Sequence, residues 1–246
     1  MTLPDAFKAL VVTENQDNQF IRSIEQKKID DLPEGDVVVQ VLYSSLNYKY
    51  ILSATGNRGV TRNFPHTPGI DAAGIVVASA NEAFKPGDEV IVTSYDLGMN
   101  TAGGFGQYIR VPAGWVVPQP QGLTAMEAMV YGTAGFTAAL SVWNMIESGV
   151  APDDGNVLVS GATGGVGSIA VSILSKLGHS VTAVNGVVDE TDYLTEIGAK
   201  KVIGIDEASD TSGRPLLKSL WAGGIDTVGG DILATTIKST NYGATV

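Results

Sequence analysis

A glycine-rich segment constrains the fold of this chain more than any other feature of its sequence. It separates an apolar run at Val157–Val159, which predicts a buried strand, from a helical pattern at Val166–Leu177. Its glycines follow a three-residue spacing at Gly161, Gly164 and Gly167. At a strand-to-helix junction, such glycines allow a tight turn, a close approach of the backbone to a pyrophosphate, and close contact between helix and sheet. The segment therefore predicts a βαβ unit of a parallel sheet.

A dinucleotide is the ligand that such a junction favours. A helix that begins at the glycines presents free N–H groups and a partial positive charge to phosphate oxygens. The alternative interpretation of the segment is a tight turn without a ligand. Because predicted strands and helices alternate around the junction, we favour the dinucleotide.

Two patterns of hydrophobicity divide the chain near residue 124. From residue 1 to residue 123, short β-like runs alternate with turn residues, which predicts a mostly β domain. These runs are Phe7–Thr13, Val37–Ser44, Gly74–Ala80, Glu89–Ser94 and Tyr108–Val111. From residue 124 to residue 246, strand and helix patterns alternate, which predicts right-handed βαβ units and a parallel sheet. The fold class expected from the residues is therefore α/β, with a mostly β domain first.

The second half opens with a capping box, because Thr124 and Glu127 stand three residues apart ahead of an apolar pattern. Its other helices are expected at Gly132–Glu147, Asp189–Ile197 and Leu233–Ser239, and its strands at Val181–Val184, Val202–Ile205, Ile225–Val228 and Tyr242–Val246. The last run stops at the final residue, so its sheet would have a short, uncovered edge. We therefore expect the chain to be an incomplete version of a longer protein.

Composition excludes several kinds of chemistry. The 246 residues include no Cys, which excludes disulfides, iron–sulfur clusters, zinc–thiolate sites and thiol nucleophiles. The two histidines, His66 and His179, lie too far apart in sequence for a helical metal-binding pair, so no metal site is expected. A net charge of -11 disfavours nucleic acid as a partner. Neither a leader-like start nor an apolar run of membrane-spanning length is present, which predicts a cytoplasmic protein without a membrane partner.

The end of the strand after the glycine-rich segment should reveal which dinucleotide binds. An acidic residue there binds the ribose diol of NAD, whereas a neutral end with a nearby Arg or Lys suits the 2′-phosphate of NADP. The residues at this end, Asn185, Gly186, Val187 and Val188, are all neutral. Asp189 comes too late and is better placed to cap the following helix. The residues alone therefore leave the choice between NAD and NADP open.

Segments spread over almost the whole chain resemble one enzyme group. The segments are Ser45–Lys49, Asn63–Pro65, Pro68–Asp71, Gly132–Ala138, the glycine-rich segment and Trp221–Gly229. They resemble the acrylyl-CoA reductase and quinone oxidoreductase group of the zinc-independent medium-chain dehydrogenases/reductases. The resemblance implies a GroES-like catalytic domain at residues 1–123 and a Rossmann-type, doubly wound dinucleotide-binding domain at residues 124–246, with the active site in the cleft between them. It also implies that the family continues beyond Val246, in a part that would complete the sheet and form a homodimer.

The resemblance further implies which residues form the site. Tyr48, with Asn47 beside it, would be catalytic and would contact the nicotinamide end of the cofactor. Tyr48 would act on the enolate that follows hydride transfer, as a proton donor or a hydrogen-bond donor, or would only pack against the nicotinamide as an aromatic wall. The pyrophosphate would contact Thr163, Gly164, Gly165 and Val166, and the adenosine ribose with its 2′-phosphate would lie beside Asn185, Gly186, Val187, Val188 and Ile205.

Three positions depart from the pattern of this group. Tyr50 stands where the group has an acid, and Val187 and Ile205 stand where it has cationic residues expected to hold the 2′-phosphate of NADP. The resemblance implies NADP(H) as the cofactor, but the two lost cations predict weaker binding of NADP(H) than in the relatives. Ile70 occupies the position of a zinc ligand in zinc-dependent relatives, and His66 is expected to be a surface or turn residue rather than a ligand.

The activity implied by the resemblance is NADPH-dependent reduction of an activated C=C bond, in an α,β-unsaturated acyl-CoA such as acryloyl-CoA. A quinone or enone reductase of the same fold is an alternative, because fold and motif do not fix the substrate. The lost cations leave a second alternative, a dinucleotide-binding protein without catalysis. Arg58 and Arg62 are interpreted as surface residues rather than CoA contacts, and Asp71 as a buried carboxylate that caps a turn.

Overall fold

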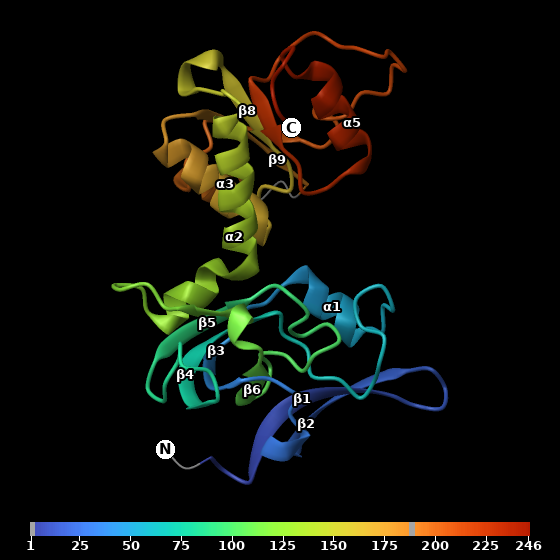
Figure 1. The fold of residues 1–246 in the computed structure, drawn as a ribbon. Helices are drawn as coiled ribbons and strands as arrows, with labels where there is room; N and C mark the ends of the chain where they lie inside the picture. Colours follow the sequence, from blue (N-terminus) through green and yellow to red (C-terminus); the bar gives the residue numbers. More distant parts are fainter. Residues whose placement is uncertain (1–2, 187–189) are drawn as a thin grey trace. The chain divides into compact units, whose positions relative to one another are not determined.

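The computed structural model describes residues 3–186 and 190–246, and its internal contacts separate two units, Met1–Thr133 and Ala134–Val246 (Figure 1). The division falls inside helix α2 (Ala125–Glu147), which starts in the first unit and ends in the second. This division follows internal contacts and does not test where one folding domain ends and the next begins. The domain boundary expected between residues 123 and 124 therefore stays a prediction.

The first unit is built from antiparallel strands. Strands β1 (Ala6–Glu14) and β2 (Phe20–Lys28) pair with each other in a two-stranded sheet. A five-stranded sheet has the order β6-β3-β4-β5-β7. Its strands are β3 (Val37–Tyr43), β4 (Asp71–Ser79), β5 (Glu89–Thr93), β6 (Tyr108–Val111) and β7 (Val116–Pro118). The helices of this unit before α2 are the α-helix α1 (Tyr48–Ala54) and the short 3-10 helices η1 (Ile29–Asp31) and η2 (Ala113–Trp115).

Alternating burial explains why the strands of this unit could be predicted. Inward-facing aliphatic side chains of the five-stranded sheet form one core, which includes Val37, Val39, Val76, Val90, Val92 and Ile109. All five predicted β-runs form strands, and β4 begins three residues earlier than expected, at Asp71. Strand β2 was not predicted, because among the described residues it pairs with β1 alone and none of its own residues is buried.

The second unit contains a parallel sheet with the strand order β10-β9-β8-β11. Its strands are β8 (Asn156–Val159), β9 (Ser180–Asn185), β10 (Lys201–Gly204) and β11 (Gly223–Ile225). Counted along the chain, this is the order 3-2-1-4 of a Rossmann-type sheet, which confirms the predicted fold class. The helices that follow α2 are the 3-10 helix η3 (Pro152–Asp154) and the α-helices α3 (Gly165–Lys176), α4 (Thr191–Glu196) and α5 (Gly230–Ser239).

Successive residues of β8 point to opposite faces of this sheet and bury both of them. Val157 and Val159 lie in a core with residues of α2, α3 and α4, whereas Leu158 lies in another core with Ile232 of α5 and with Trp221. In Figure 1, α3 accordingly lies on one side of the strands and α5 on the other. A sheet covered on both faces explains why its strands appear in the sequence as short apolar runs.

Most of the elements predicted for residues 124–246 are present, with some shifted ends. The capping box is confirmed, because the backbone N–H of Thr124 donates to Glu127 Oε2 at 2.8 Å and that of Glu127 donates to Thr124 Oγ1 at 3.2 Å. The predicted helix at Asp189–Ile197 corresponds to α4, and Asp189 itself lies outside the described residues.

The last two predicted strands differ from the structure. The run at Ile225–Val228 keeps only its first residue in β11, because Asp226 accepts hydrogen bonds from Ser160 Oγ and from the backbone N–H of Gly229 instead of pairing in the sheet. The run at Tyr242–Val246 forms no strand, since it makes a single bond to β11, from Gly224 N–H to Thr245 O at 2.9 Å.

None of the helices within residues 3–186 and 190–246 is long and apolar enough to cross a membrane.

His66 is a buried residue, which corrects the expectation of a surface or turn residue. Its side chain is only 6% exposed, because its backbone bridges to Val12 and its ring Nε2 hydrogen-bonds the carbonyl oxygen of Gly98 at 2.9 Å. Burial lowers the pKa of His66, and the bond to Gly98 and the nearby charge of Asp96 oppose this effect in part. The folded chain therefore favours the neutral ring.

This lowered pKa predicts a pH-dependent stability. A ring whose pKa is lower in the folded state than its ordinary value of 6.5 contributes full stability above that pH, and the contribution is lost as pH falls through the folded-state pKa. We expect the free energy of unfolding, measured in urea, to decrease as the pH falls below 6.5. We expect His66→Gln to make this decrease with falling pH less steep. The pKa of His179 is also lowered by burial and accounts for a remaining slope. Identical slopes in the two proteins would contradict this assignment.

Candidate functional site

The glycine-rich loop connects the end of β8 to the start of α3. Gly164 is the residue that caps the helix, and the N–H of Ser168 donates to its carbonyl oxygen at 2.9 Å, which is the first bond of the helix. The N–H groups of the turn before Ser168 have no partner inside the helix, as at every helix start. Thr163, Gly164, Gly165 and Val166 thus lie where an anion would be bound by a helix N-terminus.

Gly167 allows α3 to approach the end of β8 unusually closely. A Cβ atom at this position would lie 2.2 Å from the carbonyl oxygen of Gly161 and 2.8 Å from Cα of Ala162. Both neighbours are backbone atoms, which cannot move aside as a flexible side chain could. The loop is therefore held in a narrow shape with its N–H groups at the helix start, which is the arrangement typical of dinucleotide-binding loops.

The ends of β9 and β10 lie at the same edge of the sheet as this loop. Asn185 and Gly204 are partners in the register of the two strands, and Asn185 is buried. A Cβ atom on Gly186 would lie 3.2 Å from Cδ1 of Ile205, so these two residues are neighbours. Since the carboxyl ends of parallel strands meet at one edge, the structure brings the glycine-rich loop, Asn185, Gly186 and Ile205 to that edge.

The adenosine end of this candidate site has an apolar residue where a cation was expected. Ile205 follows β10 directly and is 47% exposed, so its side chain is accessible at the edge of the sheet. Val187 and Val188, which the sequence also assigns to this end, lie outside the described residues.

A polar cluster that was not predicted from the sequence connects the end of β8, where the loop begins, to the end of the neighbouring strand β11. Ser160 Oγ donates to Asp226 Oδ1 at 2.5 Å, and Thr227 Oγ1 donates to the carbonyl oxygen of Ser160 at 3.0 Å. These bonds join the ends of β8 and β11, where the chain order of the sheet reverses and ligands of such sheets bind. The available signal was that Ser160 directly follows the apolar run Val157–Val159 and that Asp226 interrupts the run Ile225–Val228.

The predicted catalytic pair lies in the first unit, after β3. Asn47 is the residue that caps α1, and Tyr48 is the first residue of that helix with 75% of its surface exposed. The amide nitrogen of Asn47 donates to Asp71 Oδ2 and to Ser45 Oγ, both at 2.8 Å. Tyr48 is thus available to a ligand at the surface of this unit, whereas the amide N–H groups of Asn47 are already engaged.

A second exposed aromatic residue lies at the same end of the five-stranded sheet. Asp71 at the start of β4 pairs with Thr93 at the end of β5, so the residues after Thr93 emerge near the Asn47 segment. Tyr95 is 60% exposed and its ring stacks on that of Trp115, with centroids 5.3 Å apart and an interplanar angle of 4°. Trp115 therefore acts as a packing residue.

Arg58 is tied within the first unit. Its guanidinium donates to both carboxylate oxygens of Glu14 at 2.6 Å, and it lies over the rings of Phe20 and Phe64 at 5.8 and 5.2 Å. A cation paired in this way is not available to a phosphate. The interpretation of Arg58 as a surface residue rather than a CoA contact is consistent with this arrangement.

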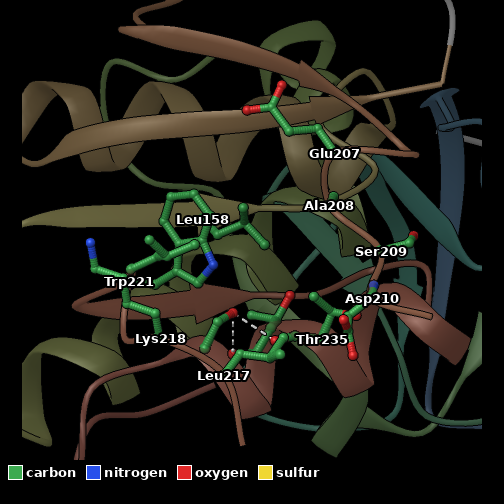
Figure 2. A pocket seen from close by; sticks show the side chains of 12 residues that line it. Leu158, Glu207, Ala208, Ser209, Asp210, Leu217, Lys218, Trp221 and Thr235 are labelled. Carbon is green, nitrogen blue, oxygen red and sulfur yellow. Dashed lines mark hydrogen bonds between the residues drawn. The ribbon is translucent and has the colours of Figure 1, made fainter. Parts of the chain in front are cut away.

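A cavity of about 280 Å³ in the second unit is separate from these residues. Figure 2 shows the indole of Trp221 beside Leu158, with Asp210, Lys218 and Thr235 among the other lining residues. The lining contains none of the residues assigned to the dinucleotide. As for metals, no group of three or more His, Asp or Glu side chains that could hold an ion occurs within residues 3–186 and 190–246.

The chain is similar to known proteins over nearly its whole length. Residues 33–121 match the alcohol dehydrogenase GroES-like domain family. The acrylyl-CoA reductase AcuI of Ruegeria pomeroyi is 45% identical over 241 residues, which cover 98% of this chain and 73% of that protein. YhfP of Bacillus subtilis, named "Putative quinone oxidoreductase", is also 45% identical, over 98% of this chain and 72% of its own.

Solved structures of two relatives match the fold and contain a cofactor. The crystal structure of YhfP with NAD bound has a TM-score of 0.94 and covers 98% of this chain and 73% of the YhfP chain. The YhdH oxidoreductase of Salmonella enterica in complex with NADP has a TM-score of 0.93 and 46% identity, and covers 96% of this chain and 72% of that chain.

The close approach at Gly167 predicts a stability effect. Gly167→Ala would place a methyl group against backbone atoms, so we expect the free energy of unfolding to fall by about 1–3 kcal/mol. Gly114→Ala is the matched control, because a Cβ atom there would meet nothing within 4 Å. Urea unfolding of the two variants and the wild type measures the difference. Equal stabilities for both variants would show that the loop relaxes freely.

Proposed function

The chain belongs to the acrylyl-CoA reductase and quinone oxidoreductase group of the medium-chain dehydrogenases/reductases, and we propose that it reduces an activated carbon–carbon double bond with NADPH. The observation that carries this proposal is the glycine-rich loop at the reversal point of a 3-2-1-4 sheet, which has the shape that a pyrophosphate requires. The favoured substrate is an α,β-unsaturated acyl-CoA such as acryloyl-CoA, after the relative of that name.

A quinone is the second candidate substrate. YhfP is as similar to this chain in sequence as the acrylyl-CoA reductase is, and its name assigns it to quinones. Both substrates contain a carbon–carbon double bond conjugated to a carbonyl group, so the same hydride donor and the same oxygen-stabilising groups serve both.

The residues of the second unit would bind and orient the cofactor, which supplies a hydride when bound. The loop end with Thr163 and Gly164 and the first turn of α3 with Gly165 and Val166 would lie against the pyrophosphate. The N–H groups of the first turn would donate to it, since that of Gly164 already donates to the carbonyl oxygen of Gly161. The strand ends with Asn185, Gly186 and Ile205 would lie beside the adenosine ribose, and so would Val187 and Val188. Because Ile205 is not a cation, the 2′-phosphate would lack a charge partner at this position.

The residues of the first unit would act on the substrate. Hydride addition to the β-carbon leaves an enolate, and the exposed phenol of Tyr48 would donate a hydrogen bond to its oxygen or a proton to its α-carbon. Asn47, at the cap of α1, would fix the position from which Tyr48 acts. The reaction needs no Lewis acid on an alcohol oxygen, which agrees with Ile70 at the position of a zinc ligand in other relatives.

The remaining expectations concern the cell and the assembly. We propose a homodimer, which the resemblance to this group implies, and the cytoplasmic location that the sequence predicts. The small-molecule substrate is supported by the names of the relatives, which refer to an acyl-CoA in one case and to a quinone in the other.

The activity is tested by following nicotinamide absorbance with NADPH and either acryloyl-CoA or a small quinone. We expect oxidation of NADPH with acryloyl-CoA, and a fall in kcat of about 100-fold for Tyr48→Phe, the loss typical of a removed proton donor. Tyr242→Phe, a change at a fully exposed tyrosine, is the matched control. Unchanged kcat in Tyr48→Phe would show that the phenol is not needed for catalysis and would favour the alternative that Tyr48 only packs against the nicotinamide. Dinucleotide binding without oxidation by any acceptor would favour the non-catalytic alternative.

The cofactor preference is tested at Ile205. We expect the wild type to bind NADPH more weakly than its relatives do. We expect Ile205→Arg to tighten NADPH binding by about 10-fold, because the added guanidinium can form a charge-assisted hydrogen bond with the 2′-phosphate. NADH, which lacks this phosphate, is expected to bind unchanged. Titrations followed by nicotinamide fluorescence give both affinities. Ile237→Arg adds the same charge at another exposed isoleucine, on α5, and serves as the control. Sub-micromolar binding of NADPH by the wild type, with strong preference over NADH, would contradict the hypothesis.

A further inference from the structure

Asp71 is a completely buried carboxylate in the first unit. It is the first residue of β4, and its exposed fraction is 0%. Burying a charged or polar group costs free energy unless hydrogen bonds replace its water. Donors from two other segments of the chain, the loop after β3 and helix α2, supply these bonds to Asp71.

The first group of donors comes from the loop between β3 and α1. Asn47 Nδ2 donates to Asp71 Oδ2 at 2.8 Å, and Ser45 Oγ donates to the same oxygen. Asn47 Nδ2 also donates to Ser45 Oγ at 2.8 Å, so these three side chains form a closed triangle of hydrogen bonds. Ser44 Oγ adds a bond to the backbone carbonyl oxygen of Asp71 at 2.6 Å. The loop is thereby attached to β4 at consecutive positions.

The second group of donors comes from the interruption in α2. Gly132 has φ 49° and ψ -154°, outside the helical region, so the helix restarts at Thr133. Thr133 donates its backbone N–H to Asp71 Oδ2 at 3.1 Å and its hydroxyl to Oδ1 at 2.6 Å. A carboxylate at the start of a helix satisfies a free N–H group and is favoured by the helix dipole.

Gly132 and Asp71 fit each other closely. A Cβ atom on Gly132 would lie 2.8 Å from Asp71 Oδ2 and 3.0 Å from Ser45 Oγ, and the positive φ of Gly132 would strain any other residue. The carboxylate therefore occupies a space that only a glycine at position 132 leaves open. A network in which every donor is satisfied holds one arrangement of its segments.

The arrangement fixes the residue that precedes Tyr48. Asn47 caps α1, and its carbonyl oxygen accepts the N–H of Tyr50 at 2.9 Å, so the start of the helix follows from the position of Asn47. Tyr48 is the next residue and is 75% exposed, whereas Asp71 has no exposed surface. Asp71 can reach a ligand only through its neighbours.

We propose that Asp71 is the positioning residue of the candidate active site, whose carboxylate holds Asn47 and thereby sets the location of the Tyr48 phenol. The proposal rests on the proposed function, because it assigns the network a role in the reduction of the substrate. It goes beyond the turn cap that the sequence indicated, since the bonds of Asp71 join β4 to the catalytic segment and to the restart of α2. Asp71 does not touch the substrate and is not itself catalytic.

The test is the isosteric substitution Asp71→Asn. It turns one acceptor oxygen into an NH2 group, which at the Oδ2 position would face the amide of Asn47 and the N–H of Thr133, and at the Oδ1 position the Thr133 hydroxyl. In either orientation Asn47 loses a carboxylate as its acceptor, so it is expected to move. We expect kcat to fall by about 100-fold, as for a displaced catalytic group, with KM for NADPH changed by less than about twofold. Asp88→Asn is the matched control, because Asp88 accepts a single backbone bond, from Lys85, in a turn at the start of β5. A structural role alone would lower stability and leave kcat unchanged, which would overturn the proposal.

A rescue variant separates position from charge. The double variant Asp71→Asn with Asn47→Asp restores a carboxylate–amide pair with the partners exchanged, and we expect it to recover at least about tenfold in kcat over Asp71→Asn. Should Asp71→Asn fail to fold, Ser45→Ala removes one donor and leaves the carboxylate in place. We then expect a fall in kcat of about tenfold at unchanged KM for NADPH. Wild-type kcat in Ser45→Ala would overturn the proposal in that case.

A readout without turnover keeps this proposal distinct from the proposed function. Crystal structures of the wild type and of the variant that folds compare the positions of Asn47 and Tyr48, and amide hydrogen exchange compares Thr133. We expect displaced side chains and faster exchange at Thr133 when Asp71 is changed, since its N–H loses an acceptor. Inactive wild type would refute the proposed function alone. Unmoved Asn47 and Tyr48 would overturn the role of Asp71, whatever the activity.

Discussion

The contact between α3 and the end of β8 is the constraint on which the second unit depends. At Gly167 the helix approaches the backbone of Gly161 so closely that a Cβ atom would lie 2.2 Å from its carbonyl oxygen. This approach lets the apolar residues of α3 reach Val157 and Val159, and it fixes the first turn of the helix at the edge where β8, β9 and β10 end. The core and the candidate binding site thus have the same cause.

The first unit depends on a polar contact instead. The carboxylate of Asp71 is buried and joins β4, the loop before α1 and the restart of α2 at Thr133. A buried charge requires several donors at once, so these segments cannot shift independently. Tyr48 directly follows Asn47, so the network fixes the stretch of backbone from which its exposed ring extends.

Regular patterns of burial account for the parts of the fold that could be predicted. The strands around Val157 and Val181 and the helix at Val166 were found because both faces of a parallel sheet are covered, and continuous apolar runs result. Strand β2 was missed, since it pairs only with β1 and buries no residue. The burial of His66 could not be predicted, because it follows from contacts with Val12 and Gly98, which are distant in sequence.

Periodicity and glycine spacing predict the two kinds of architecture and the loop that a dinucleotide would occupy, because both are properties of short stretches of chain. The amino-acid sequence also places Ile205, and not a cation, directly after β10. The folded chain was needed to find the partners of Asp71, the burial of His66 and the bond between Ser160 and Asp226. These depend on which distant segments meet, and hydrogen bonds between such segments leave no periodic trace in the sequence.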